Sequence, residues 1–356
     1  MSEASPRERL EAIKKNLSES DRSKVSKKLD ELALGCKGTI EKAIATDLAH
    51  LQLVSLCINP FTENSTIGCG YLFIRTDPLL SVGEKIPDVL LYHSGDKLVV
   101  LVECKSSVAD PRKEVGEILS KVETARRHKE LLEQTIGDTI GDIEFVVCVA
   151  PEFIVNMKEA IRGTNEHVCL WSANALNKTI FLIPIDDDKS KKPWERGTHR
   201  NADLTSSLID GLRPESGSVR IQPFLATSNM GIIVSELFPR LALELMTSGS
   251  KQFVGMDVLT LVERLLPNHE RTELERISSA SLDTACHIGI VTDDSPGQHN
   301  PSEKSFSFAM KHLSGAKIQE KYVKEKAQEA AREQIVEEIG RHRGRLRDYI
   351  EPQENH

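Results

Sequence analysis

The chain has 356 residues, of which 39% are hydrophobic and 28% charged, so it is long enough for two folded domains and its composition excludes wholesale disorder. A formal net charge of −8 and an aromatic content of 4% argue against a highly cationic nucleic-acid coat and against a base-stacking platform for single strands. A net negative charge is still compatible with a local basic surface or with a metal site built from acidic residues.

The cysteines and the N-terminus indicate the compartment. Seven cysteines are present, and no two of them form a C-x-x-C pair, which argues against a zinc cluster. Cys104, Cys148 and Cys169 lie in or beside apolar runs and are expected to be reduced core residues. The N-terminus lacks the apolar core of a signal peptide, and no run approaches the roughly 20 apolar residues that span a bilayer. We expect a cytoplasmic protein, or a nuclear one if the host has a nucleus.

The first part of the chain is expected to be helical. Residues 6–34 place leucine and isoleucine at helical spacing among many charges, which predicts an N-terminal extension of one or two amphipathic helices over residues 1–36. Glycines at 35 and 38 then break this pattern. Thr39 is expected to cap a new helix that runs to about Leu56.

Residues 37–185 alternate strands and helices and predict an α/β domain, with a mixed sheet flanked by helices. The expected strands cover residues 70–75, 88–93, 97–105, 143–150, 167–171 and 179–184, and the expected helices cover residues 111–134 and 153–162.

A candidate site lies where two of these strands meet. Asp88 follows Pro87 at the start of one strand, and the next strand ends in Glu103, Cys104 and Lys105. The short turn between the two strands predicts antiparallel pairing, which would bring Asp88 near Glu103. Glu103 and Lys105 are two residues apart on a strand and therefore share a face, whereas Cys104 points into the apolar layer.

Two carboxylates and one lysine in this arrangement suit metal-assisted cleavage of a phosphodiester. Mg²⁺ or Mn²⁺ prefers oxygen ligands, which Asp88 and Glu103 would supply, with the backbone carbonyl of Cys104 or Val102 as a further ligand. Lys105 would orient or deprotonate the attacking water and face the developing phosphate charge. The interpretation is a metal-dependent DNA endonuclease. An RNA-cleaving nuclease stays open as an alternative, as does a non-catalytic nucleic-acid-binding or regulatory protein of the same fold.

These motifs resemble the PD-(D/E)XK nuclease superfamily, and they are most similar to those of archaeal Holliday-junction resolvases. The matching segments are residues 37–42 (Lys-Gly-Thr-Ile-Glu-Lys), 86–90 (Ile-Pro-Asp-Val-Leu) and 101–106 (Leu-Val-Glu-Cys-Lys-Ser). The resemblance covers residues 37–150 and implies a restriction-endonuclease-like core. By position it makes Glu41, on the first core helix, the fourth active residue beside Asp88, Glu103 and Lys105. Asp47 on the same helix competes for that role.

Several groups are candidates for binding nucleic acid. Ser106 or Ser107, just beyond the third strand, and Lys121, on the following helix, would contact phosphate. The glutamates interspersed on that helix equally allow a plain solvated surface. Arg343 and Arg345 belong to a basic cluster near the C-terminus, which would either grip a nucleic-acid backbone or form a solvated helix end.

The remaining chain is expected to form a second, mainly helical domain. Residues 186–219 are polar and predict a linker, in which residues 204–212 could form a short helix. Within residues 220–313, helices at 232–246, 255–266 and 269–287 precede strands at 288–292 and 304–310, the order of a winged helix. Residues 314–356 contain a last charged helix. This part would recognise the substrate, a partner or a second copy, and a homodimer is expected because one such site cuts one strand.

Overall fold

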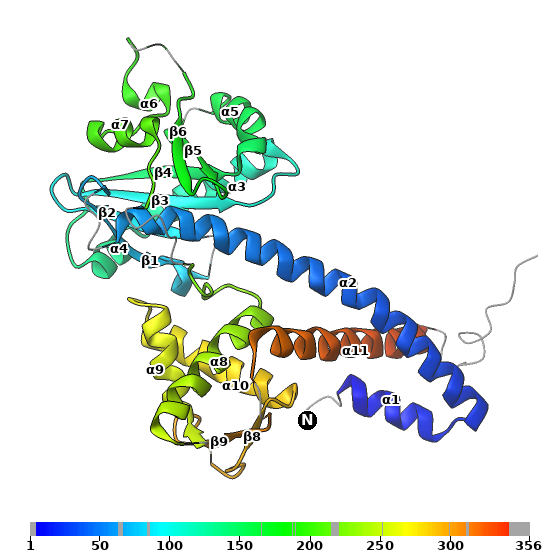
Figure 1. Ribbon diagram of the computed structural model, residues 1–356. Coiled ribbons are helices and arrows are strands. Elements are labelled where there is room, and N and C mark those ends of the chain that lie inside the picture. The colour runs from blue at the N-terminus through cyan, green and yellow to red at the C-terminus, as the bar shows by residue number, and fades with distance from the viewer. Residues whose placement is uncertain are drawn as a thin grey trace, which may run out of the picture.

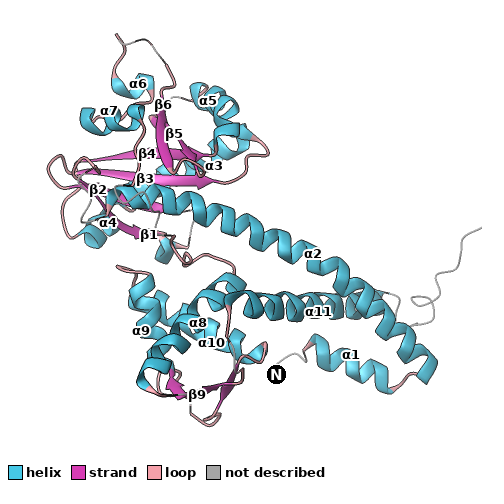
Figure 2. Ribbon diagram, in the orientation of Figure 1, coloured by secondary structure: helices cyan, strands magenta, loops and turns pink. Residues whose placement is uncertain are grey.

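The structure, a computed structural model, describes residues 5–62, 67–83, 86–164, 166–186, 188, 190–214, 221–250, 252–298, 300–310 and 313–341. A six-stranded mixed sheet flanked by helices forms one part of the molecule. A mainly helical part with a three-stranded sheet lies below it in Figures 1 and 2. Within the described ranges, none of the helices combines the length and the apolarity that crossing a bilayer requires.

Helix α2 is a single unbroken element of 40 residues, Glu19–Ile58, which is about 60 Å at the usual rise per residue. Its first turn is capped by the Ser18 hydroxyl, which accepts a hydrogen bond from the Asp21 backbone at 3.2 Å. The predicted break at Gly35 and Gly38 was wrong. Each exposed glycine costs a helix about 1 kcal/mol relative to alanine, and packing of α2 against helix α11 (Gly315–Arg341) offsets that cost.

The sheet has strand order β1-β2-β3-β4-β5-β6. The first three strands pair antiparallel, β3, β4 and β5 pair parallel, and β6 pairs antiparallel with β5. The strands are β1 (Tyr71–Thr76), β2 (Val89–His93), β3 (Leu98–Lys105), β4 (Asp142–Val149), β5 (Val168–Asn174) and β6 (Thr179–Ile183). Strands β3 and β4 occupy the centre and are buried on both faces, as their continuous apolar runs predict.

Helices cover both faces of the sheet, which confirms the predicted α/β fold class. The C-terminal third of α2 packs on one face, together with α7 (Ala202–Asp210). The other face is covered by α3 (Pro111–Arg127), α4 (Lys129–Ile136) and α5 (Ile154–Arg162). Pro111 occupies the first turn of α3, as expected, and Asp110 caps that helix, but the predicted single helix is divided at His128.

The segment expected to be a linker packs on the sheet in its described part, which includes α6 (Pro193–Arg196) and α7. His199 is buried and its Nδ1 lies 2.7 Å from a carboxylate oxygen of Glu144 on β4. Leu212 forms an isolated bridge with Ile180 on β6. The polar composition of the segment hid these anchors, because a buried histidine and a single leucine give no apolar periodicity.

The second part contains three helices followed by a hairpin, as predicted. They are α8 (Met230–Ser248), α9 (Gly255–Leu265), α10 (Arg271–His287), β8 (Val291–Asp293) and β9 (Ser305–Phe308). The sequence did not reveal β7 (Gln252–Val254), which pairs with β9 and is too short for an alternating pattern. Helix α11 then leaves this part and runs beside α2 toward α1 (Pro6–Lys15) (Figure 1).

A buried polar contact joins the two parts. Arg75 on β1 donates to a carboxylate oxygen of Glu273 on α10 at 2.9 Å, and both side chains are almost fully buried. The same guanidinium lies 3.0 Å from His269 Nδ1. Nearby, Asp77 accepts a hydrogen bond from the Ala226 backbone at 3.0 Å. Because both partners of the ion pair are desolvated, separation of the two parts would leave unpaired charges and is strongly disfavoured.

Candidate active site

The β2–β3 hairpin brings Asp88 and Glu103 together. Val89 pairs with Val102 in antiparallel register, and the Asp88 backbone donates to the Val102 carbonyl at 2.9 Å. Continuing that register places Asp88 opposite Glu103. The predicted antiparallel pairing is therefore confirmed. Both side chains are mostly buried, at 12% and 5% exposure.

Two donors fix the carboxylate of Asp88. The Cys104 backbone donates to Oδ2 at 2.7 Å, and Nε2 of His50 lies 3.1 Å from Oδ1. Burial raises the pKa of Asp88, but the hydrogen bond and the charge of His50 outweigh burial and leave this pKa below its ordinary value. Asp88 is therefore held as a carboxylate.

Glu103 lies between two lysines. Its Oε2 is 2.5 Å from Lys121 Nζ on α3, and its Oε1 is 3.1 Å from Lys105 Nζ. Lys105 also lies 2.8 Å from the carboxylate of Glu114. Burial and the negative charge of Asp88 raise the pKa of Glu103, and the two lysines limit that rise.

Lys105 is an ammonium in this arrangement. Burial alone would lower its pKa, but the carboxylates of Glu103 and Glu114 outweigh burial and raise that pKa above its ordinary value. A lysine held in this state cannot accept a proton from water. The geometry therefore favours an electrostatic role for Lys105 over the role of a base.

Helix α2 contributes His50 rather than Glu41. Glu41 is exposed, with its carboxylate 3.7 Å from Lys37, and it lies nine residues before His50, about 13 Å along the helix axis. The structure does not bring Glu41 to Asp88 and Glu103. Asp47 is also directed elsewhere, since its carboxylate accepts a hydrogen bond from the Asn229 backbone at 2.6 Å, at the start of α8.

The residues predicted to bind nucleic acid fall into three places. Lys121 joins the site through Glu103. Ser106 is half-buried and directly follows Lys105 at the end of β3, whereas Ser107 is exposed. Arg343 and Arg345 lie outside the described residues.

The donor set fits a hard divalent cation. Asp88 and Glu103 present carboxylate oxygens from adjacent strands, and the Cys104 carbonyl lies on the same strand end, which is the oxygen chemistry that Mg²⁺ or Mn²⁺ prefers. The charge of Asp88 raises the pKa of Glu103, so the two carboxylates destabilise each other when both are ionised. A cation between them would relieve that repulsion.

His50 is the residue that sequence reasoning missed. Its partner is 38 positions away in the chain, so no local spacing connects the two. The available signal was indirect, because His50 adjoins Leu51, a buried position on the face of α2 that packs on the sheet.

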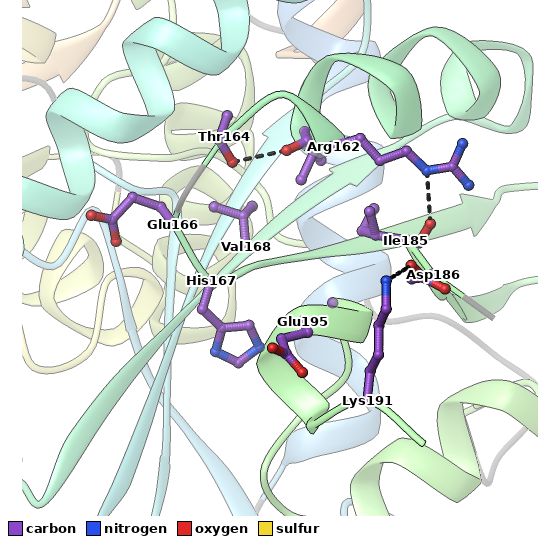
Figure 3. Close-up of a pocket in the computed structure, with 11 residues that line it drawn as sticks. Arg162, Thr164, Glu166, His167, Val168, Ile185, Asp186, Lys191 and Glu195 are labelled. Atoms are coloured by element: carbon purple, nitrogen blue, oxygen red, sulfur yellow. Dashed lines mark hydrogen bonds and ion pairs between the residues drawn. The ribbon is translucent and has the colours of Figure 1, made fainter. Parts of the chain in front are cut away.

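A polar cavity of about 560 Å³ lies elsewhere on the sheet (Figure 3). It is lined by the start of β5 and the end of β6, whereas Glu103 and Lys105 lie at the end of β3. Since β3, β4 and β5 are parallel, the cavity and the candidate site are at opposite ends of the sheet. Its cations are already engaged, with Lys191 2.6 Å from Asp186 and Arg162 donating to the Ile185 carbonyl at 3.0 Å.

Comparison with known proteins gives one distant similarity. No family model matches the chain, and no solved structure matches it. An uncharacterized protein of Archaeoglobus fulgidus is 28% identical over 150 residues, which span 40% of this chain and 39% of that protein. The chain thus matches well under half the length of this relative, and the similarity names no activity.

Proposed function

We propose that the chain is a Mg²⁺- or Mn²⁺-dependent endonuclease of the PD-(D/E)XK type that hydrolyses phosphodiester bonds in DNA. The observation that carries this proposal is the meeting of Asp88 and Glu103 on adjacent strands, with the Lys105 ammonium 3.1 Å from Glu103. A helix before the hairpin and a helix after it, both touching the site, agree with the motif resemblance. The homodimer and the cytoplasmic location remain predictions.

In this proposal each side chain has a distinct role. Asp88 and Glu103, with the Cys104 carbonyl, would hold the cation. The bound cation would neutralise the phosphate and lower the pKa of an attacking water. His50 and the Cys104 backbone orient the Asp88 carboxylate, and Lys121 orients Glu103. Lys105 faces the scissile phosphate and stabilises its developing charge.

The second part would serve recognition. Three helices and a hairpin in this order resemble a winged helix, a fold that places one helix against a nucleic acid or a partner. On α10, however, Glu273 is turned inward to Arg75 and Arg271 pairs with Glu275 at 3.0 Å. This mixed charge makes a base-reading helix less fitting than a contact with a partner or a second copy.

A cleavage panel tests the proposal. The full chain is incubated with supercoiled, linear, branched and single-stranded DNA and with RNA, in Mg²⁺, Mn²⁺ or a chelator. Cleavage is expected on at least one DNA with metal and none in chelator. Asp88→Asn and Lys105→Met should each lower the rate by about 10²-fold or more, typical for the loss of one electrostatic or proton-transfer group.

Two exposed positions serve as matched controls. Asp283→Asn and Lys42→Met remove the same charges outside the site and should leave the rate unchanged. Full activity in folded Asp88→Asn and Lys105→Met would reject the site. Absence of metal-dependent cleavage on every substrate would reject the nuclease function, and cleavage confined to RNA would replace the proposed substrate.

A further inference from the structure

Three thiols meet on the face of the sheet that α2 covers. Cys57 lies in the last turns of α2, Cys104 on β3 and Cys148 on β4. Their sulfur atoms all lie within 4.8 Å of one another. Each residue is at most 1% exposed. We refer to these three residues as the thiol triad.

The fold itself brings the triad together. Cys104 and Cys148 are direct partners in the parallel β3–β4 pairing, so their side chains leave the same face of the sheet side by side. Helix α2 crosses that face and places Cys57 above them, with its sulfur 3.7 Å from that of Cys104. The three cysteines are far apart in sequence, so the absence of a C-x-x-C pair did not exclude a cluster in the folded chain.

The spacing suits a single metal ion. A zinc–sulfur bond of about 2.3 Å places sulfur ligands about 3.8 Å apart in tetrahedral geometry and about 4.0 Å apart in a trigonal one. The sulfur atoms of Cys57 and Cys104 are 3.7 Å apart, close to these values, and the other two sulfur–sulfur distances are at most 4.8 Å. Packing alone would also tolerate such distances, because cysteine often behaves as a small apolar residue. Convergence of three thiols from three separate elements is what distinguishes the triad from Cys169, which is equally buried on β5.

We propose that Cys57, Cys104 and Cys148 bind one thiophilic metal ion, Zn²⁺ or Cu⁺, as a structural site. Thiolate ligands select soft and borderline cations over Mg²⁺ and Mn²⁺. Each thiol that binds releases its proton to solvent, and no oxidation state changes. Three thiolates complete a trigonal set for Cu⁺. On Zn²⁺ they leave a fourth position, which the complete burial of the triad closes to a substrate, so the ion would stabilise the fold rather than react.

The triad lies directly behind the proposed nuclease site. Cys104 is flanked by Glu103 and Lys105, and its backbone donates to Asp88 at 2.7 Å. An ion held by the triad would tie α2 to β3 and β4 at this point of the sheet. The metal proposal does not depend on nuclease activity, because its readouts are metal content and thiol protection.

Metal binding can be measured directly on the full chain. Because the triad is sealed, Zn²⁺ or anaerobic Cu⁺ is added both to the folded protein and during refolding from denaturant. We expect close to one ion per chain by elemental analysis after gel filtration, and a thiolate-to-metal absorption band for Cu⁺. Cys104→Ala should lower the amount of retained metal by at least about tenfold. Replacing a residue that only supports a metal ligand can already lower metal affinity by this factor, so removing a ligand should do at least as much.

Two controls separate the triad from other sites. Cys169→Ala removes a buried strand cysteine outside the triad and should keep the metal. Asp88→Asn should also keep it, which distinguishes this site from the proposed Mg²⁺ site. If Cys104→Ala fails to fold, alkylation of the wild type followed by peptide mapping replaces it. Metal should then slow the labelling of Cys57, Cys104 and Cys148 but not that of Cys36 or Cys286.

The proposal is overturned by either of two results. One is a folded wild-type chain that retains neither ion after both loading procedures. The other is a Cys169→Ala variant that loses as much metal as Cys104→Ala. Retention of one ion with loss confined to triad variants, or triad-specific protection from alkylation, supports it.

Discussion

Two carboxylate–histidine pairs lie on the same sheet, and their surroundings differ. His199 and Glu144 are sealed, at 0% and 1% side-chain exposure, and the other nitrogen of His199 accepts a hydrogen bond from Trp171 at 2.9 Å. The Arg200 backbone satisfies the second oxygen of Glu144 at 2.8 Å. His50, in contrast, is 22% exposed, and its partner Asp88 adjoins Glu103 and two lysines.

The comparison teaches which feature marks a site for chemistry. The Glu144–His199 pair has both carboxylate oxygens and both ring nitrogens hydrogen-bonded within the fold, so it anchors the 196–212 segment. At Asp88 a second carboxylate lies opposite, which is unfavourable unless a cation or a proton intervenes. A pair that is sealed and satisfied stabilises the fold. A pair that lies beside a second carboxylate, and depends on nearby cations to offset their repulsion, is the better candidate for a metal site.

The largest expected effect belongs to the sealed pair. Replacing His199 with Ala leaves Glu144 buried without its main partner, which should lower the free energy of unfolding by about 3–5 kcal/mol. Chemical denaturation measures this loss. Cleavage per folded molecule should stay at the wild-type level. A fall in activity without a loss of stability would break the distinction between the two pairs.

The next effect belongs to the acid opposite Asp88. Glu103→Gln should lower metal-dependent cleavage by about 10²-fold, which corresponds to about 2.7 kcal/mol in the activation barrier. Its free energy of unfolding should also fall, but by less than in the His199 variant, because Lys105 keeps Glu114 as a partner and Lys121 alone loses the carboxylate of Glu103. A rate measurement at saturating metal, paired with a denaturation curve, checks both. Glu159→Gln on α5 serves as a control outside the site.

A smaller effect distinguishes two roles for Lys121. If this lysine orients Glu103, then Lys121→Met should slow cleavage by about tenfold, or about 1.4 kcal/mol, and move the acidic limb of the pH–rate profile to higher pH. The shift follows because the loss of a cation raises the pKa of Glu103 further. The affinity for DNA, measured in Ca²⁺ to prevent cleavage, should change less. An equal loss of affinity with an unmoved pH profile would assign Lys121 to phosphate binding instead.

The smallest effect concerns the pH dependence of stability. Burial alone would lower the pKa of His50, but Asp88 and neighbouring carboxylates outweigh burial and raise that pKa above 6.5. The folded protein therefore binds this proton more tightly than the unfolded chain does. The resulting stabilisation is complete below about pH 6.5 and is lost as the pH rises through the pKa of the folded state. His50→Gln should thus be destabilised by about 1 kcal/mol at pH 6 and by less at pH 9. A stability difference that grows with pH would contradict this assignment.

The sequence predicted those parts of the fold and site that depend on local pattern. The β2–β3 hairpin, its antiparallel register and the shared face of Glu103 and Lys105 follow from alternation over a few residues and a short turn. Pro111 likewise indicated the start of α3. Such features are encoded by neighbours in the chain, so periodicity and turn chemistry suffice to find them.

What the sequence did not reveal depends on contacts between distant segments. His50 reaches Asp88 because α2 crosses the sheet, and no spacing rule links a helix to a strand 38 residues later. The same crossing brings Cys57 to Cys104. Local propensity predicts a break in α2 at Gly35 and Gly38, but packing against α11 keeps the helix continuous. The sequence could not reveal this contact, since α11 begins almost 280 residues further on.

The continuity of α2 has a mechanical consequence. One end of this helix carries His50 and Cys57 against the sheet, and the other end is clasped by α1 and α11 (Figure 1). A rod without a hinge transmits displacement along its whole length. A partner that displaced the N-terminal end of α2 would therefore also displace His50 and change its contact with Asp88. The position of Asp88 and Glu103 in the site is in this way mechanically coupled to the far end of the helix.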